Sequence, residues 1–162
     1  MTHPIALRAM RQSDLPLFRA WLHLPHVAAW FRDPEDWIFE VEHQDGAFSF
    51  VRHFIVEARG RPVGFCQYYE YRHSGEDWHG DTPLAGTYSI DYLIGETAFL
   101  GKGYGRRIVL ALLDRIRSHP DAARVIVQPE PENLPSCRAL LACGFRHDAA
   151  NGIYIREGFG GL

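Results

Sequence analysis

The stretch Tyr88-Ser-Ile-Asp-Tyr-Leu-Ile-Gly95, with Leu100-Gly-Lys-Gly-Tyr-Gly105 after it, decides how this chain folds. The first segment is rich in aromatic and β-branched residues, which predicts a buried strand. Residues 108–116 have apolar side chains at helical spacing. A strand, a glycine-rich loop and a helix therefore follow one another, and the unpaired amides of the first helical turn point toward the loop. This arrangement predicts a binding site for a phosphate group.

The spacing of these glycines excludes two common phosphate-binding motifs. A dinucleotide-binding fingerprint needs a third glycine where Arg106 stands. A P-loop needs Ser or Thr after its lysine, and here Gly103 follows Lys102. Lys102 and Arg106 add positive charge at the loop. The alternative interpretation is a glycine-rich turn between strand and helix that binds no ligand.

The composition is that of an ordinary folded domain. The chain has 162 residues, of which 46% are hydrophobic and 23% charged, and its formal net charge is −3. We expect a single domain over residues 1–162. The net charge argues against nucleic acid as a partner, and no apolar run approaches the roughly 20 residues of a membrane span. We therefore expect a cytoplasmic protein, monomer or homodimer, without a signal peptide and with its cysteines reduced.

Acidic side chains are concentrated in the first half of the chain. Residues 1–81 carry twelve Asp and Glu against eight Lys and Arg, whereas residues 82–162 carry eight against nine. Residues 33–45 contain six acids and no Lys or Arg, and a second group consists of Glu70, Glu76, Asp77 and Asp81. Either both groups are solvated surfaces, or an acidic half faces a cationic substrate while the other half holds an anionic cofactor.

Hydrophobic periodicity along the rest of the chain predicts a mixed α/β sandwich around one sheet. We expect helices at residues 25–31, 34–44 and 134–143, another that follows the glycine loop and runs to Ser118, and an earlier one capped by Ser13 or Asp14. Expected strands are residues 5–10, 50–58, 62–71, 86–94, 124–128, 145–150 and 153–156. Asn151-Gly152 predicts a type I′ turn in the last hairpin. Trp30, Phe31 and Trp37 either line a substrate cleft or belong to the core.

The glycine loop resembles the pyrophosphate loop of the GNAT acyl-CoA N-acyltransferases, Q/R-x-x-G-x-G/A, with Leu100 in the Q/R position. Asn133, Ser136, Gly144 and Phe145 match the register of a second motif of that family, N-x-x-A/S followed by G-F. With two motifs in the correct order, the chain is identified as a member of this superfamily. The resemblance implies a mostly antiparallel sheet with one splayed parallel strand pair and helices on both faces.

The same resemblance implies that acetyl-CoA lies in the opening between the splayed strands. Its pantetheine arm would pair with the backbone of the strand, and its pyrophosphate would meet the glycine loop. The residues expected to contact it are Tyr92, Leu93, Ile94, Leu100, Gly101, Lys102, Gly103, Tyr104, Gly105, Arg106, Asn133 and Ser136.

Within the superfamily, the chain looks most similar to aminoglycoside 6'-N-acetyltransferases. These carry an aspartate in the strand, as at Asp91, preceded by an acidic, tryptophan-containing loop, as at residues 75–81. The acyltransferases of siderophore synthesis usually have histidine at the position of Asp91. However, Leu140 replaces a tyrosine often proposed as general acid, and Val127-Gln-Pro-Glu-Pro131 is similar to the siderophore group. A siderophore-type enzyme acting on hydroxylated lysine or a polyamine, or a non-catalytic acyl-CoA-binding module, are the alternatives.

The chemistry expected is direct acetyl transfer to a small-molecule primary amine. Asp91 is the candidate base, since a lysine-like ammonium must lose a proton before it attacks. The thiolate leaving group can depart unprotonated, so the absence of the tyrosine at Leu140 need not abolish turnover. Tyr104, Tyr68 or water are the groups that could substitute for it. A metal site is not expected, because His73 and His79 lack a third ligand nearby. The residues expected to bind the amine substrate are Trp30, Glu70, Glu76, Asp77, Trp78, Asp81 and Asp91.

Overall fold

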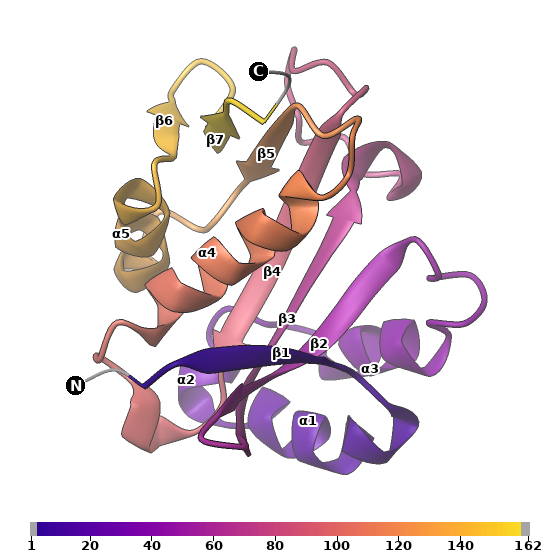
Figure 1. Ribbon diagram of the computed structural model, residues 1–162, viewed down its shortest axis with the longest axis vertical. Coiled ribbons are helices and arrows are strands. Elements are labelled where there is room, and N and C mark those ends of the chain that lie inside the picture. Colours follow the sequence, from indigo (N-terminus) through magenta and orange to yellow (C-terminus); the bar gives the residue numbers. More distant parts are fainter. Residues whose placement is uncertain (1–2, 160–162) are drawn as a thin grey trace.

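A seven-stranded sheet forms the centre of the computed structural model, which describes residues 3–159 (Figure 1). The strand order is β1-β2-β3-β4-β5-β7-β6, and the β4–β5 pair is parallel while the other pairs are antiparallel. This is the mostly antiparallel mixed sheet that the sequence predicts. The strands are β1 (Ile5–Ala9), β2 (Val51–Ala58), β3 (Arg61–Glu70), β4 (Thr87–Ile94), β5 (Arg124–Val127), β6 (Arg146–Asp148) and β7 (Ile153–Glu157).

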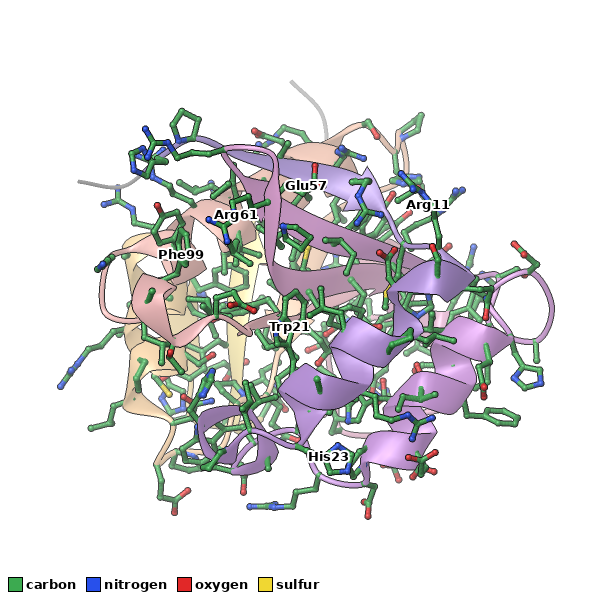
Figure 2. The ribbon with its side chains drawn as sticks, turned by 90° about the horizontal axis from the view of Figure 1, so that it is seen from below. Arg11, Trp21, His23, Glu57, Arg61 and Phe99 are labelled. Atoms are coloured by element: carbon green, nitrogen blue, oxygen red, sulfur yellow. The ribbon has the colours of Figure 1, made fainter. Side chains whose placement is uncertain are left out.

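Helices cover both faces of the sheet, as predicted. The amphipathic α4 packs on one face, where Ile108, Leu112 and Ile116 are fully buried with residues of β2 and β4. The first helices pack on the other face, and Figure 2 shows Trp21 directed inward from α1 while His23 lies at the periphery. No described helix is long and apolar enough to cross a membrane. The α-helices are α1 (Leu15–Leu22), α2 (Pro25–Ala28), α3 (Pro34–Glu42), α4 (Tyr104–Arg117) and α5 (Leu134–Ala142), and the 3-10 turns are η1 (Gln12–Asp14), η2 (Tyr71–His73) and η3 (Thr97–Phe99).

The parallel strands β4 and β5 diverge soon after they begin. Their pairing is limited to Thr87 with Arg124 and Tyr88 with Val125. In Figure 1 the two strands lie together near the top of the view and separate below, where α5 follows β5. Residues 89–94 of β4 thus have no β5 partner. Their backbone groups on that side are open to a ligand, except the Ile94 carbonyl oxygen, which lies 2.8 Å from His26 Nε2. The predicted splayed pair is confirmed.

The glycine loop brings the chain from β4 to the start of α4. Gly101 and Gly103 have φ values of 69° and 84°, in the left-handed region that costs other residues energy. Gly103 is the N-cap residue of α4. Asn133 caps α5 as predicted, because its side chain accepts a hydrogen bond from the Ser136 N–H at 3.4 Å. Both helices therefore begin at the opening between β4 and β5.

The type I′ turn predicted at Asn151-Gly152 is wrong. Asp148 pairs with Ile153, so the loop of this hairpin has four residues. Gly152 has a positive φ of 67°, but Asn151 does not, and a type I′ turn needs both. The side chain of Asn151 instead donates to Asp81 and Asp148, which holds its backbone in another conformation. A turn with the type I′ signs occurs at Arg59 and Gly60, between β2 and β3.

The backbone of Gly95, just after β4, lies directly against the indole ring of Trp21. A Cβ atom at Gly95 would lie 2.2 Å from that ring, whose indole N–H donates to Glu96 Oε2 at 2.7 Å. Since Trp21 is only 2% exposed, the ring has little room to move. We expect Gly95→Ala to destabilise the fold by about 1–3 kcal/mol.

Urea unfolding checks this expectation through a lower midpoint at an unchanged slope. Gly46→Ala is the matched control, because its Cβ would meet its nearest neighbour, the His43 carbonyl oxygen, at 3.8 Å. The control should unfold like the wild type. An unchanged midpoint for Gly95→Ala would contradict the contact between the glycine and the indole.

Candidate active site

Two cavities meet at the opening between β4 and β5. The first, which we call the acidic cavity, has a volume of about 450 Å³, and the second, the glycine-loop groove, about 690 Å³. The wall common to both consists of Trp30, Phe31, Tyr92, Asn133 and Ser136. This wall combines residues from the segment after α2, from β4 and from the start of α5. A ligand in the groove would therefore lie next to one in the acidic cavity.

The acidic cavity is lined by carboxylates and aromatic rings, with no Lys or Arg among its lining residues. Of its four carboxylates, Glu130 binds Arg32 at 2.9 Å, while Glu40, Glu76 and Asp91 have no ion-pair partner within residues 3–159. Such a lining favours a cation, since carboxylates attract it through charge and aromatic faces through their quadrupole. The aromatic residues are Trp30, Phe31, Trp37, Phe48, Phe50, Tyr69, Trp78 and Tyr92.

Asp91 stands in the middle of β4 and faces this cavity. Its Oδ2 accepts a hydrogen bond from Gln67 Nε2, on the neighbouring β3, at 2.9 Å. Burial raises the pKa of Asp91 to about 6, against the lowering effect of Gln67. Its raised pKa lies close to neutral pH, where a group can both accept and release a proton.

Glu40 on α3 faces the same cavity. Burial, and then the charges of Asp91 and Glu76, raise the pKa of Glu40 to about 7. Tyr69 donates its hydroxyl to Glu76 Oε1 at 2.6 Å, and burial holds the pKa of Tyr69 well above its usual value. The charges of Asp91 and Glu76 thus disfavour the ionisation of Glu40, and the charge of Glu76 disfavours that of Asp91. A bound cation would relieve this repulsion.

Four of the seven residues expected to bind substrate line the acidic cavity, namely Trp30, Glu76, Trp78 and Asp91. The other three acids are not among its lining residues. Glu70 pairs with Arg72 at 2.6 Å, and the carboxylate of Asp81 accepts a hydrogen bond from Asn151 at 2.7 Å. Asp77 is exposed in the loop after η2.

The glycine-loop groove contains eleven of the twelve residues expected to contact coenzyme A, and Lys102 is the exception. Gly101, Gly103 and Gly105 line it where α4 begins, so backbone can approach a ligand there without side chains in the way. The first turn of α4 contains no acid, and Arg106 and Arg138 add positive charge. An elongated ligand with a diphosphate fits this donor set.

Tyr92 contributes a hydroxyl group to the wall between the two cavities. Its hydroxyl lies 2.8 Å from Ser136 Oγ, which joins β4 to α5 by a hydrogen bond. Leu140 is fully buried in the core beneath α5. Of the other two tyrosines considered for the role of acid, Tyr104 lines the groove with its hydroxyl bonded to the backbone N–H of His3, whereas Tyr68 bonds His119 and lines neither cavity.

Several lining residues are absent from the sequence-based prediction. Glu40 follows Trp37 by one helical turn, and this spacing within the acidic segment was the available signal for it. Gln67 is the one side-chain amide within the buried residues 63–69 of β3, which also marks it. His26 bonds the Ile94 carbonyl oxygen at 2.8 Å, a contact across 68 positions that no local pattern indicates. Within residues 3–159, no cluster of three or more His, Cys, Asp or Glu side chains is placed to hold a metal ion.

Comparison with known proteins places this geometry in a family. The model of an acetyltransferase (GNAT) domain matches residues 11–151. Aminoglycoside N(6')-acetyltransferase type 1 of Klebsiella pneumoniae is 29% identical over 147 residues, covering 87% of this chain and 73% of that protein.

Solved structures agree in fold. Aminoglycoside acetyltransferase AAC(6')-Ib in complex with coenzyme A superposes with a TM-score of 0.79 at 27% identity, covering 95% of each chain. The same enzyme in complex with coenzyme A and kanamycin gives 0.80 at 27% identity, again over 95% of each chain. The chain therefore belongs to the GNAT acetyltransferases, enzymes whose acyl donor is acetyl-CoA.

Proposed function

We propose that this protein transfers the acetyl group of acetyl-CoA to a primary amine of an aminoglycoside-like, polycationic small molecule. The observation that carries the proposal is the acidic cavity, which has aromatic walls and no lining Lys or Arg, and which meets the groove at Tyr92, the residue after Asp91. The named activity of the relative from Klebsiella pneumoniae and the kanamycin complex of a similar structure support this choice of substrate.

In this proposal, Asp91 is the base. An amine with a pKa of about 10.4 is almost entirely protonated at pH 7, so freeing its lone pair costs about 4–5 kcal/mol. The Asp91 carboxylate faces the cavity and can accept that proton directly or through water. Glu40 and Glu76 hold the remaining ammonium groups of the substrate. The aromatic walls exclude water and strengthen these charge interactions.

The groove holds the acyl donor, which supplies an acetyl thioester. The amides at the start of α4 and the side chains of Arg106 and Arg138 are suited to its phosphates. The open edge of β4 offers backbone groups to its amide-containing arm. The N–H of Tyr92 on that edge is the candidate donor to the oxyanion. The N–H of Leu93 points to the other side, where Leu93 is paired with Phe65 of β3.

The Tyr92 hydroxyl is our candidate hydrogen-bond donor to the sulfur that leaves. Burial raises the pKa of Tyr92 to about 12, so the hydroxyl keeps its proton at neutral pH. Hydrogen bonds to charged groups contribute about 1.5–3 kcal/mol, so we expect Tyr92→Phe to lower kcat about 10- to 100-fold.

Steady-state kinetics with saturating acetyl-CoA check this expectation. A thiolate of lower pKa leaves more readily without a hydrogen bond to its sulfur. With acetyl donors whose thiol is more acidic, the kcat values of Tyr92→Phe and wild type should therefore differ less. Ser136→Ala is the control, since it removes the hydroxyl partner but not the donor, and it should retain most activity. An unchanged kcat for Tyr92→Phe would contradict this role.

Thiol release from acetyl-CoA with a panel of amines tests the proposed function. The panel contains aminoglycosides such as kanamycin, a linear polyamine, lysine and N-hydroxylated lysine. Turnover should be fastest with an aminoglycoside. Preference for the hydroxylated lysine would support the siderophore-type alternative, and binding of acyl-CoA without turnover of any amine would support a non-catalytic module.

A further inference from the structure

Two buried polar side chains that lie opposite each other have atoms without a hydrogen-bond partner among residues 3–159. They are both ring nitrogens of His53 and the Oε1 atom of Gln67. His53 is 4% exposed and Gln67 is 3% exposed. A buried polar atom without a partner costs about 1–3 kcal/mol, so native proteins contain few of them. Their occurrence on neighbouring residues therefore needs a physical reason.

The two side chains belong to a polar row that crosses three strands. In the sheet register His53 of β2 is paired with Gln67 of β3, and Gln67 is paired with Asp91 of β4. Directly paired residues point to the same face, with Cβ atoms about 4.5–5.5 Å apart. An imidazole N–H and the Oε1 atom of the paired glutamine are not bonded directly, but at this spacing one water molecule can bridge them. Gln67 Nε2 already donates to Asp91 Oδ2 at 2.9 Å.

We propose that His53 donates an N–H hydrogen bond to a water molecule that in turn donates to Gln67 Oε1, and thereby positions the amide that stabilises ionised Asp91. This inference rests on the proposed function, in which Asp91 is the base. His53 touches neither cavity, so it acts through Gln67 and is a positioning residue. Through His53 the polar row extends to β2, one strand beyond Gln67 and Asp91, which line the acidic cavity.

The charge states along the row suit this role. Burial lowers the pKa of His53 to about 4, so the ring is neutral at pH 7 and carries one N–H. If the side-chain amide of Gln67 were flipped by 180°, its oxygen would face the Asp91 carboxylate and repel it. A donor at Oε1 therefore favours the orientation that stabilises ionised Asp91. The other groups that face Asp91 are Glu40 from α3, Glu76 and Tyr69. The ring of His53 lies 6.2 Å, centroid to centroid, from the uncharged ring of Phe65.

The test measures the titration midpoint of the Asp91 carboxyl by ¹³C NMR in the protein without substrates. The Asp91 resonance is assigned by its absence from Asp91→Asn. His53→Leu keeps an apolar side chain at the site but removes the donor. We expect it to raise the midpoint by roughly half a pH unit to one unit. His53→Gln restores an N–H donor, and it should return the midpoint toward the wild-type value.

A double variant separates positioning from a general structural effect. In a Gln67→Leu background the route from His53 to Asp91 is cut, so adding His53→Leu should leave the midpoint where Gln67→Leu put it. The inference is overturned if His53→Leu alone leaves the midpoint unchanged while raising stability, as deletion of an unpaired polar group would. It is also overturned if His53→Leu shifts the midpoint equally in both backgrounds. Because the NMR readout needs no turnover, absence of acetylation by wild type would refute the proposed function without deciding the role of His53.

Discussion

Asp91→Asn is expected to lower kcat/KM for the amine by about 10²–10⁴-fold, the usual contribution of a positioned general base. The amide keeps the size of the carboxylate and the contact with Gln67, but it cannot accept a proton from an ammonium. The loss should appear with saturating acetyl-CoA, because Asp91 is not among the residues that line the glycine-loop groove. The affinity for coenzyme A, measured by calorimetry, should therefore stay near the wild-type value.

The pH profiles of the two proteins should differ in shape. Wild-type kcat/KM should rise with pH through about 6, the pKa to which burial raises Asp91, and then level off as the carboxylate becomes fully ionised. The variant lacks this group and depends on amine that is already neutral. Its rate should keep rising about tenfold per pH unit toward the amine pKa of about 10.4. Parallel profiles would refute Asp91 as the base.

Loss of folding cannot imitate this result, since the variant should be the more stable protein at pH 8. Folding raises the pKa of Asp91 from 3.8 to about 6, so the folded state holds a proton that the unfolded chain loses first. The ionised carboxylate therefore lowers stability progressively as pH rises from about 4 to 6, and the penalty persists above it. Asn removes this penalty. Urea unfolding at pH 8 should show a higher midpoint for Asp91→Asn.

Glu40→Gln is the matched control for Asp91→Asn, because it also removes one carboxylate from the acidic cavity. If Glu40 only holds an ammonium group, KM for the amine should rise several-fold while kcat changes little. A large fall in kcat for Glu40→Gln, with little effect of Asp91→Asn, would assign the base to Glu40 instead.

The sequence was sufficient to predict the part of the groove at residues 92–106, because these residues follow one another along the chain. The strand, the glycine loop and the start of the helix are local features. The positive φ of Gly103 belongs to the loop itself and does not depend on distant segments. The acidic cavity was harder to predict, since it is assembled from distant segments. Glu40 reaches it only because α3 packs over the sheet next to β3. Asp81 is bonded to Asn151, seventy positions away, which no periodicity within the loop indicates.

Local rules failed where side chains found stronger partners elsewhere. Asp14 occupies the N-cap position of α1 as expected, yet its carboxylate bonds the backbone N–H of Arg11 and forms an ion pair with Arg8 at 2.9 Å instead of capping that helix. Asn151 favours a type I′ turn by its intrinsic preference, but its two carboxylate partners decide its conformation. In both cases, tertiary hydrogen bonds outweigh a propensity of a few tenths of a kcal/mol to about 1 kcal/mol.

Gly103→Ala is expected to weaken the binding of coenzyme A about 10- to 100-fold. Gly103 is the N-cap residue of α4, with a φ of 84° and a ψ of 8°. A residue with a Cβ atom is destabilised by about 1–2 kcal/mol in this left-handed region of φ and ψ. The loop can relieve that strain by turning its amides away from the groove. Loss of one hydrogen bond to a charged phosphate, about 1.5–3 kcal/mol, corresponds to this change in affinity.

Gly60→Ala separates loss of the binding geometry from backbone strain alone. Gly60 has a φ of 74° in the turn between β2 and β3, a Cβ atom there would meet no described atom within 4 Å, and it lines neither cavity. Both variants should lose similar stability in urea, yet calorimetry should show weaker coenzyme A binding for Gly103→Ala alone. The argument depends on phosphate charge, so the same variant should bind pantetheine, which lacks the diphosphate, as well as wild type does. If Gly103→Ala bound coenzyme A with wild-type affinity, the amides at the start of α4 would not be the diphosphate site.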